Sequence, residues 1–404
     1  MLQKISTYKQ TNNMSSTPMA IDSPMGANGN SILKANGVSP VPTTAKLTEM
    51  ISLYNPVKLF RHSPTPADKG QTPPSYNFIQ SINFNDNGSQ LITSETDNTM
   101  QIYDVLDGRH SKMNISAKYG CNHAMFGHAE HCIIHSSTKK DHKIRYLSAH
   151  DNSYIRYFEG HEQNVTCLSL HPGQDNFISC SEDNTLRIWD AASNNPAGIL
   201  NLTGVHLVAW DPSGNVFATA SPLAQSILLY DFRNFDKEPF ATFDILPFCQ
   251  EFSPQAIGRG WNKLAFSNDG KHLLLGTTGN GHFLLDAFDG HLKAFLRRDR
   301  GGARRLGAGD HNPDNLDPAS NEYLHTTAGD CCFTPDGRYV ISGSRVKNVL
   351  VWDTLAATAN RVLNPLHELE YAGDSAIVAF NPKYNHFATA DQEVLFWVPN
   401  TDML

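Results

Sequence analysis

Short apolar runs and turn-forming residues alternate along most of this chain. The runs are rich in Val, Ile, Leu and aromatic residues, and each is followed by Pro, Asp, Asn or Gly. Apolar runs bounded in this way are typical of short antiparallel strands. The pattern therefore predicts an all-β fold.

Two markers recur along this pattern. The first is an apolar triplet closed by an aromatic residue or leucine, often followed by Asp, at Tyr103, Tyr146, Trp189, Tyr230, Leu285, Trp352 and Trp397. The second is an apolar residue before a turn, at Phe84, Phe126, Leu170, Trp210, Phe266, Phe333 and Phe380. Both recur every 40 to 47 residues except across the same two longer intervals, 55 to 56 and 67 residues. Two markers that drift together indicate seven repeats, and the repeat length is that of a WD-repeat blade.

The sequence therefore predicts a seven-bladed WD-repeat β-propeller over residues 46–404. The two longer intervals place insertions near 247–260 and 299–325. Residues 1–45 are rich in Ser, Thr, Asn and Pro and have no period. Such a segment buries too little apolar surface to offset its ordering entropy, so we expect a disordered N-terminal arm.

The end of the chain indicates how the propeller closes. The third strand of the last blade ends near Val398, and only six residues follow. Its fourth strand must therefore come from elsewhere, and the candidate is the segment 56–61, PVKLFR. Pairing this N-terminal strand with the last blade would remove two open sheet edges.

Composition and charge exclude several classes of protein. Of the 404 residues, 40% are apolar, which excludes a wholly disordered chain. The formal charge of −8 argues against direct sequence-specific binding of nucleic acid. No apolar run is long enough to span a membrane, and the N-terminus has no secretory signal. Seven cysteines without a CxxC pair indicate reduced thiols in the cytosol or nucleus.

The third repeat contains a set of four residues that WD-repeat proteins use as a structural relay. His161 follows Gly160 at the start of the repeat, Ser179 lies on the second strand and Asp183 in the following turn. Trp189 closes the third strand. In WD-repeat proteins these four side chains form hydrogen bonds that tie the turn to the blade. The other repeats keep only parts of the set, so we expect packing to hold them.

No catalytic motif stands out, and we predict no enzyme, no cofactor and no metal. The chain has no GxSxG elbow, P-loop, HExxH or dinucleotide fingerprint. His128, His131 and His135 suggest a metal site, but an extended strand gives them poor geometry for one ion. Adjacent Cys331 and Cys332 point to opposite faces of a strand, which favours packing.

Three basic features are candidates for partner binding. Lys139, Lys140 and Lys143 lie between two strands of the second repeat, on the face of the relay turns. Arg233 follows Tyr230–Asp231 on the opposite face and matches the D-x-R variant of WD-repeat proteins that dock on cullin ubiquitin ligase adaptors. Arg297–Arg305 holds five arginines, which suit nucleic acid, phosphopeptide or an import receptor. Alternatively, the residues of each set are ordinary surface charges that are solvated or paired with carboxylates of their own blade.

Several longer stretches resemble one family within the WD-repeat proteins, the small WD-repeat subunit of the COMPASS histone H3 lysine methyltransferase complex. The resemblance runs from about residue 47 to the end of the chain. It rests on 118–120, 144–161, 230–243, 266–271, 286–290 and 396–399. The N-terminal arm and the two insertions depart from the family pattern.

The resemblance implies a nuclear, non-catalytic scaffold that holds a SET-domain histone methyltransferase and its complex. It implies a link to the phosphorylated tail of transcribing RNA polymerase II. In fungi the same subunit also belongs to the mRNA cleavage and polyadenylation factor. The alternative is a substrate receptor of a cullin-type ubiquitin ligase, which would use Arg233.

Overall fold

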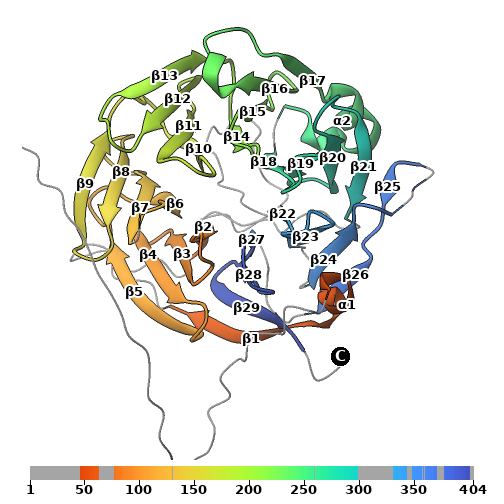
Figure 1. Ribbon diagram of the computed structural model, residues 1–404, viewed down its shortest axis with the longest axis horizontal. Coiled ribbons are helices and arrows are strands. Elements are labelled where there is room, and N and C mark those ends of the chain that lie inside the picture. The colour runs from red at the N-terminus through yellow and green to blue at the C-terminus, as the bar shows by residue number, and fades with distance from the viewer. Residues whose placement is uncertain are drawn as a thin grey trace, which may run out of the picture. The chain divides into compact units, whose positions relative to one another are not determined.

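The computed structural model describes residues 46–62, 77–129, 131–258, 260–298, 331–343, 348–356, 358, 360–370 and 377–400. In this part of the chain, strands form seven sheets that surround a common centre (Figure 1). The all-β, seven-bladed propeller expected from the sequence is confirmed. The predicted disordered arm (1–45) and the predicted insertion near 299–325 lie outside the described residues.

The first four blades follow one another along the chain, and each is an antiparallel sheet whose strands run in sequence order from the centre outward. Blade one holds β2 (Ile79–Phe84), β3 (Gln90–Glu95), β4 (Thr99–Asp104) and β5 (Arg109–Ile115). Blade two holds β6 (Asn122–Phe126), β7 (Cys132–Ser136), β8 (Ile144–Ser148) and β9 (Ser153–Phe158). Blade three holds β10 (Val165–Leu170), β11 (Asn176–Ser181), β12 (Thr185–Asp190) and β13 (Pro196–Asn201). Blade four holds β14 (Leu207–Trp210), β15 (Val216–Ser221), β16 (Ser226–Asp231) and β17 (Ala241–Asp244), with the 3-10 helix η2 (Phe232–Asn234) before β17.

The last three blades depart from this plan. Blade five holds β18 (Trp261–Phe266), β19 (His272–Thr277), β20 (Gly281–Asp286) and β21 (Leu292–Arg297), and a fifth strand, β25 (Val362–Leu363), joins it. Blade six holds β22 (Cys331–Phe333), β23 (Tyr339–Gly343), β24 (Asn348–Asp353) and β26 (His367–Glu370). Blade seven holds β27 (Ile377–Phe380), β28 (Phe387–Ala390), β29 (Glu393–Pro399) and, from the other end of the chain, β1 (Tyr54–Arg61).

The pairing of β1 with β29 closes the propeller as the sequence predicted. The two strands are antiparallel, from Tyr54 opposite Pro399 to Arg61 opposite Glu393. The segment before β1, helix α1 (Leu47–Met50) and the 3-10 helix η1 (Ile51–Leu53), adds Ile51 to the core between blades six and seven. Closure of the propeller therefore involves the segment before β1 as well as β1 itself.

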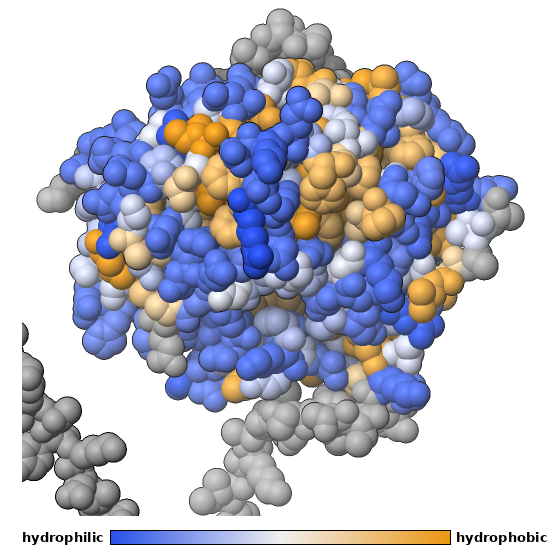
Figure 2. Space-filling view, turned by 45° about the horizontal axis from the view of Figure 1, so that its top comes forward, coloured by the Kyte–Doolittle hydropathy of each residue, from blue (hydrophilic) through white to orange (hydrophobic). Residues whose placement is uncertain are grey.

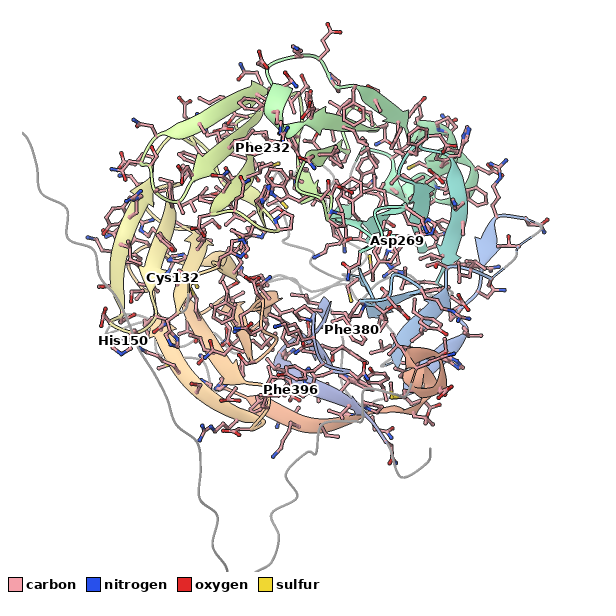
Figure 3. All side chains as sticks on the ribbon, in the orientation of Figure 1. Cys132, His150, Phe232, Asp269, Phe380 and Phe396 are labelled. Carbon is pink, nitrogen blue, oxygen red and sulfur yellow. The ribbon has the colours of Figure 1, made fainter. Side chains whose placement is uncertain are left out.

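The described residues form seven hydrophobic clusters, and each fills the space between two neighbouring blades. Side chains occupy the gaps between the ribbons, as for Phe232, which reaches from blade four toward blade three (Figure 3). Its ring lies 5.0 Å from that of Trp210 and 5.6 Å from that of His171. Burial of one large apolar side chain contributes about 2 kcal/mol, so the clusters supply most of the stabilisation.

The register corrects one marker of the sequence analysis. Trp189 pairs with Phe177 in blade three and Tyr103 with Leu91 in blade one. The equivalent residue in blade two is Leu147, which pairs with Ile133, and not the expected Tyr146. Tyr146 lies one position earlier and packs with the cluster between blades two and three.

The segment near 247–260, where the sequence predicted an insertion, is partly helical. Helix α2 (Leu246–Phe252) and the 3-10 helix η3 (Pro254–Ala256) connect blades four and five. Cys249 and Ala256 are buried in the cluster between these blades. The insertion is therefore packed onto the propeller. Among the described residues, no helix has the length and apolar character needed to cross a membrane.

Candidate partner-binding surfaces

The four relay side chains of blade three are hydrogen-bonded to one another. His161 Nδ1 lies 2.9 Å from Asp183 Oδ2, and His161 Nε2 lies 2.6 Å from Ser179 Oγ. The indole of Trp189 donates to the same hydroxyl at 2.8 Å. With Nδ1–H donating to Asp183, Nε2 accepts the Ser179 hydroxyl proton. The relay thus joins the start of the blade, its second and third strands and the turn between them.

Burial and hydrogen bonds set the charge states of this relay. Burial lowers the pKa of His161, although Asp183 opposes the shift. Burial raises the pKa of Asp183, but hydrogen bonds from Thr185, the Glu162 backbone and His161 outweigh it and lower the pKa to about 2. A neutral imidazole therefore bonds a carboxylate at neutral pH.

Other blades replace the relay with different side chains. Ser342 in blade six has the register position of Ser179, but its partner is His282 of blade five, at 2.8 Å. Thr389 takes the position in blade seven and accepts from Trp397 Nε1 at 2.9 Å. In blade one the buried carboxylate of Glu95 accepts from Asn77 at 2.5 Å. Comparison with the relay motif did not single out these groups because none keeps all four residue types at the relay positions.

We name the face that carries the relay turns the relay face. On it, the loop between β7 and β8 holds the predicted Lys139, Lys140 and Lys143. The backbone N–H groups of Thr138 and Lys139 both donate to the carbonyl of Tyr119, which fixes the loop to the segment before blade two. Lys140 adopts a left-handed backbone conformation at φ 63°.

A buried arginine supports this loop from below. Arg145 donates to both carboxylate oxygens of Asp141, at 2.8 and 2.7 Å, and is 1% exposed. Its guanidinium lies 3.7 Å from the centre of the Tyr119 ring, 5.8 Å from that of Tyr154 and 5.5 Å from that of Tyr157. A bidentate ion pair and stacked aromatic rings hold the guanidinium in one orientation. This cluster was not predicted from the sequence, because its one arginine and three tyrosines come from three separate segments and form no single motif.

The lysines on this face differ in their partners. Lys143 is ion-paired with Glu159. Within the described part of the chain, no carboxylate lies at ion-pair distance from Lys118, Lys139 or Lys140. Lys118 lies 4.8 Å from the Tyr119 ring, and its hydrogen bond lowers the pKa of that phenol. We define Lys118, Tyr119, Lys139, Lys140 and Tyr157 as the blade two surface, a rigid cationic and aromatic region.

Arg233 lies on the face opposite the relay turns, as its position after the third strand predicted. It is exposed within η2, and its backbone N–H donates to Asp231 Oδ1 at 2.9 Å. Hydrogen bonds from Asn234 and the Arg233 backbone lower the pKa of Asp231. The structure therefore separates Arg233 from the three lysines by the depth of the propeller.

The histidines considered for a metal site have other contacts. His128 Nδ1 lies 2.6 Å from Asp86, and its Nε2 lies 2.8 Å from the carbonyl of His171. His135 is buried, and burial lowers its pKa to about 4. His131 is exposed beside His150, which lies at the periphery of blade two (Figure 3). Over the described ranges, no three His, Cys, Asp or Glu side chains are grouped to hold a metal ion.

Only the first two arginines of the cluster Arg297–Arg305 belong to the described residues. Arg297 ends β21, and Arg298 is buried, with its guanidinium donating to the carbonyls of Thr277 and Gly279 at 2.6 and 2.7 Å. The buried Arg298 is therefore not available to a partner. The remaining arginines, up to Arg305, lie outside the described residues. Cys331 and Cys332 pack into different clusters, as expected for neighbours on a strand.

Comparison with known proteins points to one kind of WD-repeat protein. The family model "WD domain, G-beta repeat" matches residues 152–190 and 323–353. The chain is 38% identical to "WD repeat-containing protein 82" of Drosophila melanogaster over 325 residues, 80% of this chain and 91% of the relative. It is 35% identical to "COMPASS component SWD2" of Saccharomyces cerevisiae over 323 residues, 79% and 90%. It is 31% identical to "Set1 complex component swd2" of Schizosaccharomyces pombe over 341 residues, 79% and 92%.

Proposed function

We propose a function from the family of this chain, which is the WD-repeat family that includes COMPASS component SWD2, Set1 complex component swd2 and WD repeat-containing protein 82. The protein is a non-catalytic scaffold subunit of a COMPASS-like histone H3 lysine methyltransferase complex. The observation that carries the proposal is the identity of 31 to 38% across about four fifths of the chain. A closed propeller offers two faces and a rim, and it assembles partners without chemistry of its own.

The proposal places the protein in the nucleus, bound to a SET-domain methyltransferase. It also includes a link to the phosphorylated tail of RNA polymerase II and a share in the cleavage and polyadenylation machinery, as the family resemblance implies. The blade two surface is our candidate for acidic partners, because no described carboxylate lies at ion-pair distance from its lysines and its loop is held rigidly. Fixed cations favour association with acidic segments and lose less freedom on binding.

Affinity purification tests the assignment. The endogenous protein is tagged and purified from nuclear extract at moderate salt, and co-purifying subunits are identified by mass spectrometry. We expect a SET-domain methyltransferase and its core subunits, together with cleavage and polyadenylation subunits. A cullin and its adaptor without a methyltransferase would overturn the proposal.

Two variants assign the faces. Lys139→Glu with Lys140→Glu reverses two charges on the relay face that have no ion-pair partner among the described residues, and Arg233→Ala removes the exposed side chain on the other face. We expect the lysine variant to lose acidic partners and Arg233→Ala to retain the methyltransferase. Loss of the methyltransferase only in Arg233→Ala would place its docking site on the face opposite the relay turns.

A further inference from the structure

The outer strands of the blades can be compared at one register position. Each third strand ends in a marker residue, such as Trp189 in blade three. The position compared lies on the fourth strand, where it pairs with the residue two before that marker; in blade three Ile199 pairs with Arg187. The seven residues, from blade one to blade seven, are Met113, Tyr157, Ile199, Thr242, Phe295, Glu368 and Leu59. Thr242 and Glu368 are polar and exposed. The other five blades carry a large apolar side chain here.

Blade five covers its apolar residue with the chain's own elements. Phe295 is 3% exposed, because β25 pairs in parallel with β21 along it and the Phe252 ring of α2 stacks on it at 5.3 Å. The backbone N–H of Phe295 donates to the carbonyl of Arg361, the residue before β25. The edge of a fourth strand in this propeller thus accepts an added extended segment.

The apolar residues at this position in blades seven, one, two and three have no such cover in the described part of the chain. Exposed fractions are 48% for Leu59, 43% for Met113, 41% for Tyr157 and 47% for Ile199. Single apolar side chains at a surface are ordinary, and Figure 2 shows hydrophobic residues interspersed with hydrophilic ones. What singles out this rim is that apolar residues recur at one position of four outer strands. Among the described strands, none pairs with the outer edges of these four.

Blade two differs from the other three because its rim is continuous with a cationic region. Strand β9 exposes Ile155 at 47% as well as Tyr157. Tyr157 belongs both to the rim and to the blade two surface, since its ring lies 5.5 Å from the Arg145 guanidinium, which also lies over the Tyr119 ring beside Lys118. The end of β9 on the relay face pairs with the start of β8, directly after the loop that carries Lys139 and Lys140. Glu159, the nearest carboxylate along the strand, is neutralised by Lys143.

We propose that the outer edge of β9 binds an extended peptide segment of a partner protein by adding it as a fifth strand to blade two. The segment has apolar residues at alternate positions, which pack on Ile155 and Tyr157, and acidic residues at the end that lies on the relay face. Backbone hydrogen bonds to an edge strand provide affinity, and alternate side chains provide specificity. The inference deepens the proposed function, since it names a binding site and partner chemistry for a scaffold subunit.

The edge is held ready for such a strand. Arg156 of β9 donates to the carbonyl of Ala191 in blade three at 2.8 Å, and Tyr154 Oη lies 3.3 Å from Ser116 Oγ. These contacts tie β9 to both neighbouring blades, while Ile155 and Tyr157 remain 47% and 41% exposed. A fixed edge loses little conformational freedom when a strand is added.

Selection from a random library of twelve-residue peptides, displayed on phage and bound to the purified full chain, tests the proposal. We expect enriched peptides to carry apolar residues at alternate positions and Asp or Glu at one end. Ile155→Asp should weaken their binding by at least about tenfold, since it places a charge in an apolar contact. Ile199→Asp is the matched control, an equally exposed isoleucine on the neighbouring outer strand, and should change binding by less than about twofold.

Two further measurements separate edge pairing from other modes. Bound peptide should slow hydrogen exchange of β9 amides and leave those of β13 unchanged. Lys139→Glu with Lys140→Glu should weaken binding and flatten its dependence on salt, whereas Lys58→Glu on β1 should not. Enrichment of no peptide, of peptides that bind the Ile155→Asp variant equally well, or of peptides that protect other strands would overturn the proposal.

The outcome of the peptide selection does not depend on whether the protein belongs to a methyltransferase complex. The selection uses the purified chain alone, so a failed selection removes the β9 site and leaves the co-purification result standing. A co-purification without methyltransferase removes the proposed function and leaves the edge site to be judged by the selection.

Discussion

Ser179 shows how much one small side chain does in a blade. Its hydroxyl bonds His161 on one side and accepts from Trp189 on the other, and all of these groups are buried. In blade six the indole of Trp352 is equally buried, but its N–H has no hydrogen-bond partner among the described residues. Two tryptophans at equivalent register positions thus differ by one hydrogen bond.

This difference predicts that replacement of tryptophan by phenylalanine lowers the free energy of unfolding by different amounts in the two blades. Trp189→Phe removes packing and a hydrogen bond, whereas Trp352→Phe removes similar packing and no hydrogen bond. We expect Trp189→Phe to lower the free energy of unfolding by about 1 kcal/mol more than Trp352→Phe. Denaturant unfolding of both variants beside the wild type measures it. Equal costs would show that the relay adds no net stability.

Glu95 makes blade one sensitive to pH. Burial, and then the charge of Asp97, raise its pKa from 4.5 to about 7, although Asn77, Thr93 and Thr99 hydrogen-bond the carboxylate. Between these pH values the folded chain holds a proton that the unfolded chain has released. The stability contributed by Glu95 is therefore full below pH 4.5 and is lost as the pH rises to about 7.

We predict that the difference in the free energy of unfolding between wild type and Glu95→Gln depends on pH. Since Gln imitates the protonated carboxyl, the variant should gain stability relative to wild type by on the order of 2 kcal/mol as pH rises from 4.5 to 7.5. Buried histidines such as His386 act in both proteins and cancel in the difference. Parallel stability curves over this range would contradict the assignment.

At the scale of elements, the sequence predicted the number of blades because strand length and turn chemistry are local properties. It placed the marker of blade two on Tyr146 and not on Leu147, because an aromatic residue one position away fits the pattern equally well. Only packing decides the register: Leu147 points into the cluster between blades one and two, and Tyr146 into the next. Spacing likewise does not tell which residue of a strand end turns inward, as Arg298 does.

Strand β25 could not be predicted from local pattern at all. It has two residues, and it leaves the connection within blade six to pair with blade five. Leu363 is 8% exposed and belongs to the cluster between these blades. Nonlocal pairing of so short a segment depends on geometry that the repeat pattern does not contain.

A pair of leucines tests whether β25 contributes to stability. Leu363→Ala should lower the free energy of unfolding by about 2 to 3 kcal/mol, because it leaves a cavity in a packed cluster. Leu366→Ala, three residues later and 51% exposed, should change it by less than about 0.5 kcal/mol. Equal effects in thermal and denaturant unfolding would mean that β25 lies on the propeller without supporting it.

At the scale of the propeller, closure joins distant parts of the chain. Removal of β1 would open blade seven and expose the outer edge of β29, and it would take Tyr54 and Phe60 from two interblade clusters. An unpaired edge beside exposed apolar surface promotes aggregation. The sequence predicted this closure by the segment 56–61, which lies ahead of the first strand of blade one.

Two shortened chains test closure. Residues 46–404 should remain soluble and unfold in one cooperative transition, because all closing elements are kept. Residues 63–404 should aggregate or lose the cooperative transition. Sedimentation and thermal denaturation distinguish these outcomes. A soluble, cooperatively melting chain that starts near residue 65 would refute the closing role of β1.

The pairing of Arg61 with Glu393, 332 residues apart, also sets a delay during synthesis. At about 5 to 20 residues per second, roughly 15 to 65 seconds pass before the ribosome has made the partner of β1. Through that interval Val57 and Leu59 have no strand to pair with, and blade seven does not exist. A nascent chain of this kind depends on chaperones until its final strand emerges, and a stalled or truncated message yields a product that cannot close.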